Sequence, residues 1–210
     1  MVAKPSFSFE DKYDHPVCGI DEVGRGPLAG PVVAAAVVLK RDIIPADILG
    51  QINDSKKLTH KKRAYLFAKL HDYAYISIAE CCPREIDDIN ILQASLLAMK
   101  KAYDALQVKP MAALVDGNKA PKLSCKTQTI IGGDAKSLSI GAASIIAKHY
   151  RDELMTRHAI EFPHYGWERN AGYGTAQHLK AIEIHGVTRL HRRSFSPVSK
   201  RLLKESTANN

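Results

Sequence analysis

Five short segments of the chain have the hydrophobic pattern of β-strands. The longest uninterrupted apolar run, Val32–Leu39, contains only Val, Ala and Leu, which predicts a strand buried on both faces. Residues 73–81 instead alternate between apolar and polar side chains, as a strand with one buried face does. Glycine and proline residues separate the first two segments, so we expect a hairpin there. The predicted strands are 16–23, 32–39, 73–81, 111–115 and 126–131.

Other segments repeat their apolar residues with the period of a helix. In one of them Leu92, Leu96 and Met99 fall on a single helical face. Thr175 precedes another and is a residue type that caps helix N-termini. The predicted helices are 58–72, 91–106, 137–159 and 175–185, and the basic tail is expected to hold one more short helix.

The order of these elements predicts the fold class. Three strands come first, mostly in hairpin order, and two more follow that helices separate from the first three. This order is typical of an α/β domain with a mixed sheet. With 210 residues, the chain can bury enough surface to fold as one domain without disulfides or metals. We place this domain, including a small helical C-terminal region, at residues 15–205, after a lead-in over 1–14 and before a disordered tail over 206–210.

Acidic residues lie at the ends of three predicted strands. Asp21 and Glu22 are near the end of the first, Asp116 follows the fourth, and Asp134 follows the fifth. Ligands of open α/β sheets bind outside strand ends, so we expect these side chains to converge. Four carboxylates would repel one another, and one or two divalent cations would relieve that repulsion. Because no His or Cys lies beside these acids, the pattern favours Mg²⁺ or Mn²⁺ over zinc.

A simpler interpretation exists for the two later acids. An aspartate next to a glycine is common in turns, and Asp116 and Asp134 each have such a neighbour. We favour a site because three separate strand ends each carry an acid. Neighbouring strand residues point to opposite faces, so Asp21 and Glu22 can share the site only where the strand ends or bulges between them. The glycines of the loop that follows allow this departure.

The loop after the first strand is rich in glycine and proline. Its Gly24-x-Gly26-x-x-Ala29 spacing fits a loose dinucleotide-binding motif, but that motif must open a helix. Here Pro27 and Pro31 interrupt the segment and an apolar strand follows, so we exclude a dinucleotide site. The glycines better suit a backbone that lies close to a sugar-phosphate chain.

Basic residues outnumber acidic ones, and the formal net charge is +8. Such an excess is either an ordinary solvated surface or a surface that binds a polyanion, and composition leaves both open. The clustering favours nucleic acid, because lysines and arginines at a phosphate backbone release counterions. One cluster lies at residues 56–63 and the other in the C-terminal stretch from 189 to 204.

The cysteine pattern and the hydropathy bear on the compartment. The four cysteines form no C-x-x-C pair, which argues against a zinc site or a disulfide framework and fits a reducing compartment. The N-terminus has no apolar core of a signal peptide, and the longest apolar run is far shorter than a membrane span. We therefore expect a cytoplasmic protein with no membrane partner, and we expect a monomer.

Several motifs, in this order, give the chain a family resemblance. It resembles the bacterial ribonuclease HII enzymes, also called type 2 ribonuclease H, over about residues 17–200. Each motif is short, and their common order along the chain carries the resemblance. The motifs are Gly19 to Val32 (GIDEVGRGPLAGPV), Asp54 to Leu58 (DSKKL), Val115 to Asn118 (VDGN), Gly133-Asp134, Ala142 to Lys148 (AASIIAK), Arg151-Asp152, Gly172 to Thr175 (GYGT) and His191 to Phe195 (HRRSF).

The resemblance implies a ribonuclease H-like fold, with a five-stranded mixed sheet flanked by helices. It implies an endonuclease that hydrolyses the RNA strand of RNA–DNA hybrids and cuts at single ribonucleotides in duplex DNA. The implied chemistry uses two metal ions, Mn²⁺ or Mg²⁺, and leaves 3′-hydroxyl and 5′-phosphate ends. By similarity, the catalytic and metal-binding acids are Asp21, Glu22, Asp116 and Asp134. The implied substrate-binding residues are Gly24, Arg25 and Gly26 for the 2′-hydroxyl, Tyr173 for stacking on the following deoxyribose, and Lys56 and Lys148 as phosphate or supporting contacts.

Some roles and two rival functions stay open from the sequence. Lys148 and Asp152 are four residues apart on one predicted helix, so they form either a surface ion pair or part of the metal environment. Arg192 and Arg193 either bind substrate phosphates or anchor the tail. The rival functions are a hybrid-binding module without catalysis and another two-metal nuclease of similar fold.

Overall fold

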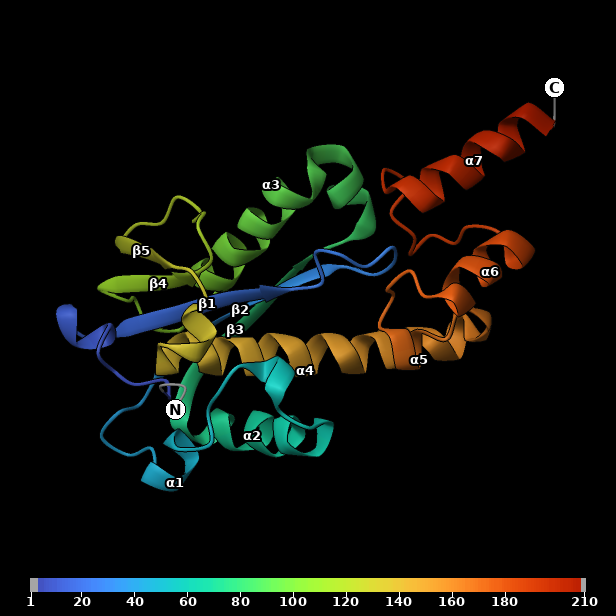
Figure 1. The fold of residues 1–210 in the computed structure, drawn as a ribbon. Coiled ribbons are helices and arrows are strands. Elements are labelled where there is room, and N and C mark those ends of the chain that lie inside the picture. Colours follow the sequence, from blue (N-terminus) through green and yellow to red (C-terminus); the bar gives the residue numbers. More distant parts are fainter. Residues whose placement is uncertain (1–3, 209–210) are drawn as a thin grey trace. The chain divides into compact units, whose positions relative to one another are not determined.

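A computed structural model describes residues 4–208 and contains a five-stranded sheet in the order β3-β2-β1-β4-β5 (Figure 1). Strand β1 lies at the centre, antiparallel to β2 and parallel to β4, and β4 pairs parallel with β5. The predicted α/β class with a mixed sheet is therefore confirmed. The strands are β1 (Val17–Val23), β2 (Val32–Leu39), β3 (Ala74–Cys81), β4 (Ala112–Asp116) and β5 (Lys126–Ile130).

Helices follow the strands much as the periodicity predicted. The α-helices are α1 (Ala46–Leu49), α2 (His60–Tyr73), α3 (Pro83–Asp104), α4 (Leu138–Glu161), α5 (Trp167–Asn170), α6 (Ala176–His185) and α7 (Ser196–Ala208). Single 3₁₀ turns are η1 (Glu10–Lys12), η2 (Ser55–Lys57), η3 (Gly133–Ala135) and η4 (Pro163–Tyr165). Helix α3 is broken at Asn90, which has a φ of 66° and whose side chain accepts the N–H groups of Leu92 and Gln93. The second half of α3 therefore begins just after Asn90, next to residue 91, where the sequence predicted the start of a helix.

The C-terminal helix differs from the expected end of the chain. The tail predicted as disordered over 206–210 is helical as far as Ala208, and residues 209–210 lie outside the described residues. Ser206 and Thr207 donate their hydroxyls to the Leu203 carbonyl at 2.8 and 3.2 Å. These bonds within one helical turn give the two polar side chains partners inside the helix.

The described residues divide into two compact units that interleave along the chain. The first, which we call the sheet unit, comprises residues 4–23, Val33–Glu80 and Ser95–His149. The second, the C-terminal unit, comprises Gly24–Val32, Cys81–Ala94 and residues 150–208. The single domain predicted over 15–205 thus contains two units. No linker in the sequence marks them, because the chain passes from one to the other several times.

The sheet unit buries one face of its sheet under α2 and the first half of α4. Buried side chains of this layer include Val37 of β2, Leu66 and Leu70 of α2, and Ile145 and Ile146 of α4. Figure 1 shows α2 and this part of α4 on the same side of the sheet. Each buried side chain contributes roughly 1.5–3 kcal/mol relative to exposure, so the layer holds the central strands in place.

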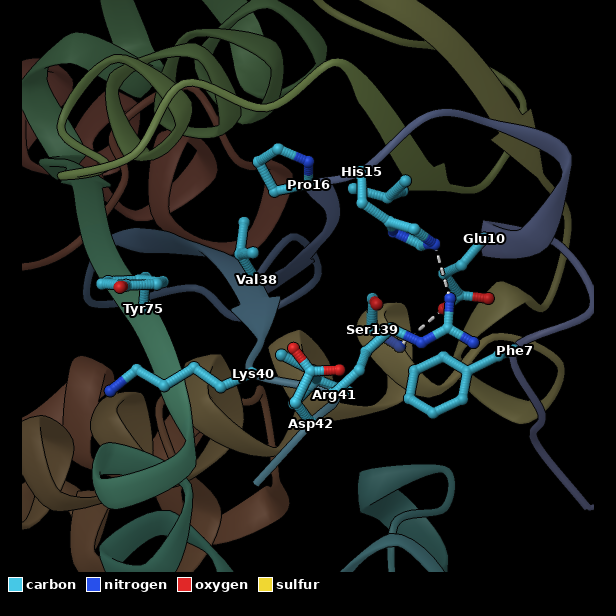
Figure 2. Close-up of a pocket in the computed structure, with 12 residues that line it drawn as sticks. Phe7, Glu10, His15, Pro16, Val38, Lys40, Arg41, Asp42, Tyr75 and Ser139 are labelled. Atoms are coloured by element: carbon cyan, nitrogen blue, oxygen red, sulfur yellow. Dashed lines mark hydrogen bonds between the residues drawn. The ribbon is translucent and has the colours of Figure 1, made fainter. Parts of the chain in front are cut away.

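A buried carboxylate holds the N-terminal segment to the sheet unit. Glu10 is 1% exposed, and its Oε1 accepts the Ser137 hydroxyl at 2.7 Å and the Ser139 N–H at 2.9 Å. The first N–H groups of a helix lack partners within the helix, so Glu10 caps α4. Glu10 and Ser139 line a cavity of about 720 Å³ together with Phe7 and Arg41. Figure 2 shows these four side chains around it. The predicted lead-in therefore contributes to this unit.

The C-terminal unit has its own apolar core around Trp167. This side chain is 1% exposed and packs with Met155, Tyr165, Ile182 and Val198. The Tyr165 and Trp167 rings are stacked with centroids 5.1 Å apart. Large aromatic side chains bury the most apolar area per residue, so these two rings anchor the unit.

Two histidines, His178 and His191, are buried beside this core with their Nε2 atoms 3.1 Å apart. The Trp167 indole N–H can only donate, so it donates to His178 Nε2 at 3.1 Å. His178 then carries its proton on Nδ1 and donates it to the Tyr173 carbonyl at 2.9 Å, while His191 Nε2 donates to His178. The Thr188 N–H donates to His191 Nδ1 at 3.0 Å. One pair of neutral tautomers thus gives each of these groups a partner, with the Trp167 and His191 N–H groups sharing the single lone pair of His178 Nε2.

We expect the protein to lose stability as the pH falls below about 6.5, because both histidines resist protonation when folded. Burial lowers the pKa of His191 to about 3, with His178 as a second cause, and burial also lowers the pKa of His178. In the unfolded chain both groups titrate near the usual 6.5, so below that pH the unfolded state binds more protons. Each histidine then removes up to about 1.4 kcal/mol of unfolding free energy per pH unit.

Urea unfolding of wild type and His191→Gln between about pH 7 and pH 5 measures this effect. Glutamine cannot be protonated here, so the variant should lose less stability per pH unit than wild type. His164→Gln is the matched control, because His164 is exposed, and its slope should equal that of wild type. Equal slopes for wild type and His191→Gln would contradict the buried neutral histidine.

Candidate active site

Asp21 lies near the end of the central strand β1 and is the most buried of the four candidate acids, at 6% exposed. Its Oδ1 accepts the N–H of Glu22 at 2.7 Å. Burial raises the pKa of Asp21 well above its usual range, and the charges of Glu22 and then Asp116 raise it further. The negative charge of Asp21 is therefore unfavourable unless positive charge is brought to it.

Asp116 and Asp134 extend this acidic cluster away from Asp21. Asp116 ends β4, the parallel neighbour of β1, and its Oδ1 accepts the N–H of Gly133 at 2.7 Å. That bond joins the end of β4 to the turn η3, which carries Asp134. Burial raises the pKa of Asp134, and the charge of Asp116 raises it further. The charge of Asp116 therefore acts on both Asp21 and Asp134, which links these three sequence-predicted acids electrostatically.

The two adjacent acids are placed without the strand end or bulge that the sequence predicted between them. Strand β1 pairs with β2 without interruption through Val23, and the pairing includes Asp21 and Glu22. Its pairing with β4 stops earlier, at Ile20. The expected end or bulge in β1 is therefore absent, and it is the neighbouring strand that ends: β4 stops at Asp116, so β1 continues past it with one edge unpaired by β4.

Helix α4 supports Asp21 with a serine that sequence reasoning missed. Ser144 is 5% exposed and hydrogen-bonds the Asp21 carboxylate, which lowers the pKa of Asp21 against the larger effect of burial. Ser55 Oγ lies 2.8 Å from Ser144 Oγ and donates to it, because the Ser144 proton goes to the carboxylate. Lys148, a predicted phosphate or supporting residue, is one turn further along α4 and shares a helix face with Ser144.

Lys56 lies on the Asp134 side of the cluster. It is exposed in the turn η2, whose capping residue Asp54 accepts the Lys56 N–H at 2.9 Å. After burial and the charge of Asp116, the charge of Asp54 also raises the pKa of Asp134, whereas Lys56 lowers it. The Lys56 ammonium is therefore close enough to Asp134 for its charge to act on that carboxylate.

The chemistry of these acids fits a hard divalent cation. All four candidate donors are carboxylate oxygens, and burial, followed by repulsion from neighbouring acids, raises the pKa of Asp21 and of Asp134. Mg²⁺ and Mn²⁺ prefer such oxygen donors and would remove the repulsion. None of the four acids lines the cavity drawn in Figure 2, so the two are separate features of the sheet unit.

The glycine-rich loop after β1 belongs to the C-terminal unit. Gly24 has a φ of 92°, and a Cβ there would lie 2.2 Å from Arg151 Nε, so only glycine fits. Arg25 and Gly26 are exposed. A Cβ on Gly26 would lie 3.3 Å from Tyr173 Cε1, and Tyr173 is 49% exposed. The structure thus places the predicted tyrosine beside the predicted loop, with its ring open to solvent.

Comparison with known proteins decides the family. The chain matches the family model for ribonuclease HII over residues 18–198. It is 51% identical over 199 residues to Ribonuclease HII of Paramagnetospirillum magneticum, a match that covers 95% of this chain and 99% of that protein. It is 50% identical over 198 residues to Ribonuclease HII of Rhizorhabdus wittichii, covering 94% and 96%. The chain belongs to the ribonuclease HII family.

A solved structure agrees with this assignment. Ribonuclease H2 from Pyrococcus horikoshii OT3 superposes with a TM-score of 0.77 at 27% identity, over 92% of this chain and 99% of that one. As a ribonuclease HII, the chain is an endoribonuclease with the ribonuclease H fold, and the resemblance, fold class and enzyme class inferred from the sequence are confirmed. Within residues 4–208, no helix is both long enough and apolar enough to cross a membrane.

The structure also separates the two arginines whose role the sequence left open. Arg192 is fully buried in this ribonuclease HII, so it does not offer its guanidinium to substrate phosphates at the surface. It binds the loop after β1 instead, together with Arg151 from α4. Arg193 is exposed, and its backbone N–H donates to Asp87 Oδ2 at 2.9 Å. Sequence reasoning missed the loop contacts of Arg192 and Arg151. The only sign of these two residues in the sequence is that each lies in a short family motif, and a motif does not show what its arginine binds.

Proposed function

We propose that this ribonuclease HII hydrolyses the RNA strand of RNA–DNA hybrids and also cuts at single ribonucleotides within duplex DNA. The observation that supports this most is the electrostatic link between the acids: the charges of Glu22 and Asp116 act on the buried carboxylate of Asp21, and the charge of Asp116 also acts on Asp134. The names of the curated relatives support an RNA-containing substrate. The exposed loop with Tyr173 beside it supports recognition of a single sugar.

The four acids would hold Mg²⁺ or Mn²⁺, and the all-oxygen donor set supports either ion. When bound, such ions supply a water of lowered pKa and positive charge for the departing oxygen. We assign the shared ligand to Asp21, because the charges of both Glu22 and Asp116 act on it. Ser144 would hold the Asp21 carboxylate in one orientation, as hydrogen bonds behind metal ligands commonly do. The products would carry 3′-hydroxyl and 5′-phosphate ends.

Discrimination between RNA and DNA at one nucleotide must depend on the 2′-hydroxyl. The backbone of Gly24, Arg25 and Gly26 would read this group. When the hydroxyl is absent, the loop group that bonds it is left unpaired, at a cost of about 1–3 kcal/mol. Tyr173 would stack on the deoxyribose that follows the ribonucleotide.

Basic residues would supply the remaining affinity. Lys56 and Lys148 would contact phosphates near the acids, and the net charge of +8 favours any nucleic acid duplex. Binding should therefore weaken as salt rises, whichever sugar is present. A monomer in the cytoplasm stays our expectation.

A cleavage assay tests the proposal. The substrates are a duplex with one ribonucleotide, a continuous RNA–DNA hybrid and an all-DNA duplex, each with metal omitted and then restored. We expect cuts in the first two substrates only, and only with Mg²⁺ or Mn²⁺. Binding without any cut would favour the non-catalytic module, and cuts in the all-DNA duplex would favour another nuclease activity.

Tyr173→Ala should reduce cutting of the single-ribonucleotide duplex more than that of the continuous hybrid. A hybrid offers ribonucleotides in many positions, whereas the embedded one depends on contacts to its neighbouring sugar. Loss of one stacking contact of about 1–3 kcal/mol corresponds to a fall of roughly 5- to 150-fold in kcat/KM. Tyr173→Phe keeps the ring and serves as the control, with activity near wild type. An equal loss on both substrates would count against the stacking role.

A further inference from the structure

Two buried arginines hold the loop after β1 from behind. We propose that Arg192, assisted by Arg151, is a positioning residue that sets the backbone of this loop for reading the 2′-hydroxyl. This inference rests on the proposed function and adds to it two residues that do not touch substrate. All the contacts that carry it lie within the C-terminal unit.

Arg192 uses its whole guanidinium on the loop. It is 0% exposed, and its Nε donates to the Gly30 carbonyl at 3.0 Å. One terminal nitrogen donates to the Arg25 carbonyl at 2.9 Å and the other to the Gly24 carbonyl. Its backbone N–H donates to the Leu28 carbonyl at 2.8 Å. One residue thus fixes both ends and the middle of the loop.

Arg151 joins the end of the same loop to the segment before Tyr173. It is 1% exposed, and it donates from Nε to the Pro31 carbonyl at 2.9 Å and from Nη2 to the Ala29 carbonyl at 3.1 Å. Its Nη1 donates to the Ala171 carbonyl at 2.9 Å. The Arg151 guanidinium therefore holds both elements proposed to read the sugar, which are the loop after β1 and the segment that carries Tyr173.

The chemistry of these contacts needs arginine. Among the described residues, every hydrogen bond recorded for the two guanidiniums ends on a backbone carbonyl. Peptide dipoles therefore solvate the two buried charges. Burial lowers the pKa of Arg192 to about 9 and that of Arg151 to about 10. A planar fork with five donors reaches three separate carbonyls at once, whereas lysine has a single nitrogen to place.

The carbonyl directions have a consequence for the exposed side of the loop. In a trans peptide, C=O and the following N–H point in opposite directions. Because the Gly24 and Arg25 carbonyls point to Arg192, the N–H groups of Arg25 and Gly26 point away from it. Two successive N–H groups on one side form a concave site that suits an oxygen atom. Tyr173, whose ring lies against Gly26, borders the same part of the loop.

Binding measurements in an Asp21→Asn background, which should bind without cutting, test the role of Arg192. The readout is the ratio of Kd values for an all-DNA duplex and the same duplex with one ribonucleotide, at one salt concentration with Mg²⁺. We expect the parent to prefer the ribonucleotide by about tenfold. Arg192→Lys should reduce this ratio to within about twofold while the Kd for all-DNA duplex stays nearly unchanged.

Two further variants keep the test decisive. Arg151→Lys should also lower the ratio, and it provides a second measurement where Arg192→Lys melts too early for binding work. Arg169→Lys is the matched control on the exposed surface of the same unit, and its ratio should equal that of the parent. Equal weakening of both duplexes in both loop variants would indicate a purely structural role and would overturn the inference.

The same data separate this inference from the proposed function. A parent that binds both duplexes equally would show that the protein does not read the 2′-hydroxyl at all, and both proposals would fail. If the parent prefers the ribonucleotide duplex, and Arg192→Lys and Arg151→Lys show the same ratio of Kd values as the parent, only the positioning role would be overturned.

Discussion

Asp21→Asn is expected to abolish cutting while substrate binding stays intact or becomes tighter. Replacing a residue behind a metal ligand commonly costs 10- to 100-fold, so loss of the shared ligand itself should cost more than about 100-fold. Asparagine keeps the shape of the side chain but removes a negative charge that burial and two neighbouring acids already disfavour. Repulsion of substrate phosphates falls for the same reason.

Single-turnover cleavage and a binding titration on the same single-ribonucleotide duplex measure the two effects separately. Asp47→Asn is the matched control, because Asp47 is exposed in α1 of the same unit and should leave both quantities unchanged. Turnover near wild type in Asp21→Asn would remove the metal assignment. A large loss of binding would show that the residue acts in substrate affinity instead.

Gly19→Ala is expected to destabilise the protein by about 3 kcal/mol or more, at the upper end for overpacked cores. A Cβ on Gly19 would lie 2.1 Å from the Ser139 carbonyl carbon and 2.3 Å from the Ile140 nitrogen. Both are backbone atoms in the first turn of α4, and Glu10 holds that turn through the Ser139 N–H. The helix cannot yield without losing this cap, so β1 would have to move, and Asp21 with it.

Urea unfolding of Gly19→Ala checks this close approach of strand and helix. Gly50→Ala is the control, since Gly50 has ordinary helical angles and is exposed. Its unfolding free energy should change by less than about 1 kcal/mol. A similarly small change for Gly19→Ala would mean that β1 and α4 lie further apart than the structure places them.

Much of the sheet could be predicted because its strands are short and strongly apolar. The run Val32–Leu39 is fully buried and forms β2 with the predicted bounds. The four-residue helix α1 was missed, since one helical turn is too short to show a period. The second half of α3 was predicted as a helix from residue 91, but the role of Asn90 in breaking the helix was not.

The candidate site divides in a similar way. The acids were predicted to converge because strand ends share an edge, and the charge of Asp116 does act on both Asp21 and Asp134. The end of the pairing between β1 and β4 beside Asp21 could not be predicted, because the sequence does not show where two strands stop pairing. Buried arginines were also out of reach, since a basic pair such as Arg192 and Arg193 ordinarily lies at the surface.

The central claim is that the four acids gather divalent cations, and a manganese-soaked crystal tests it most directly. Anomalous scattering at the manganese edge locates the ions without reference to activity. We expect manganese between the carboxylates of Asp21, Glu22, Asp116 and Asp134, and none in an Asp21→Asn crystal soaked in the same way. Manganese elsewhere only, or four carboxylates lying apart with no ion among them, would contradict the account.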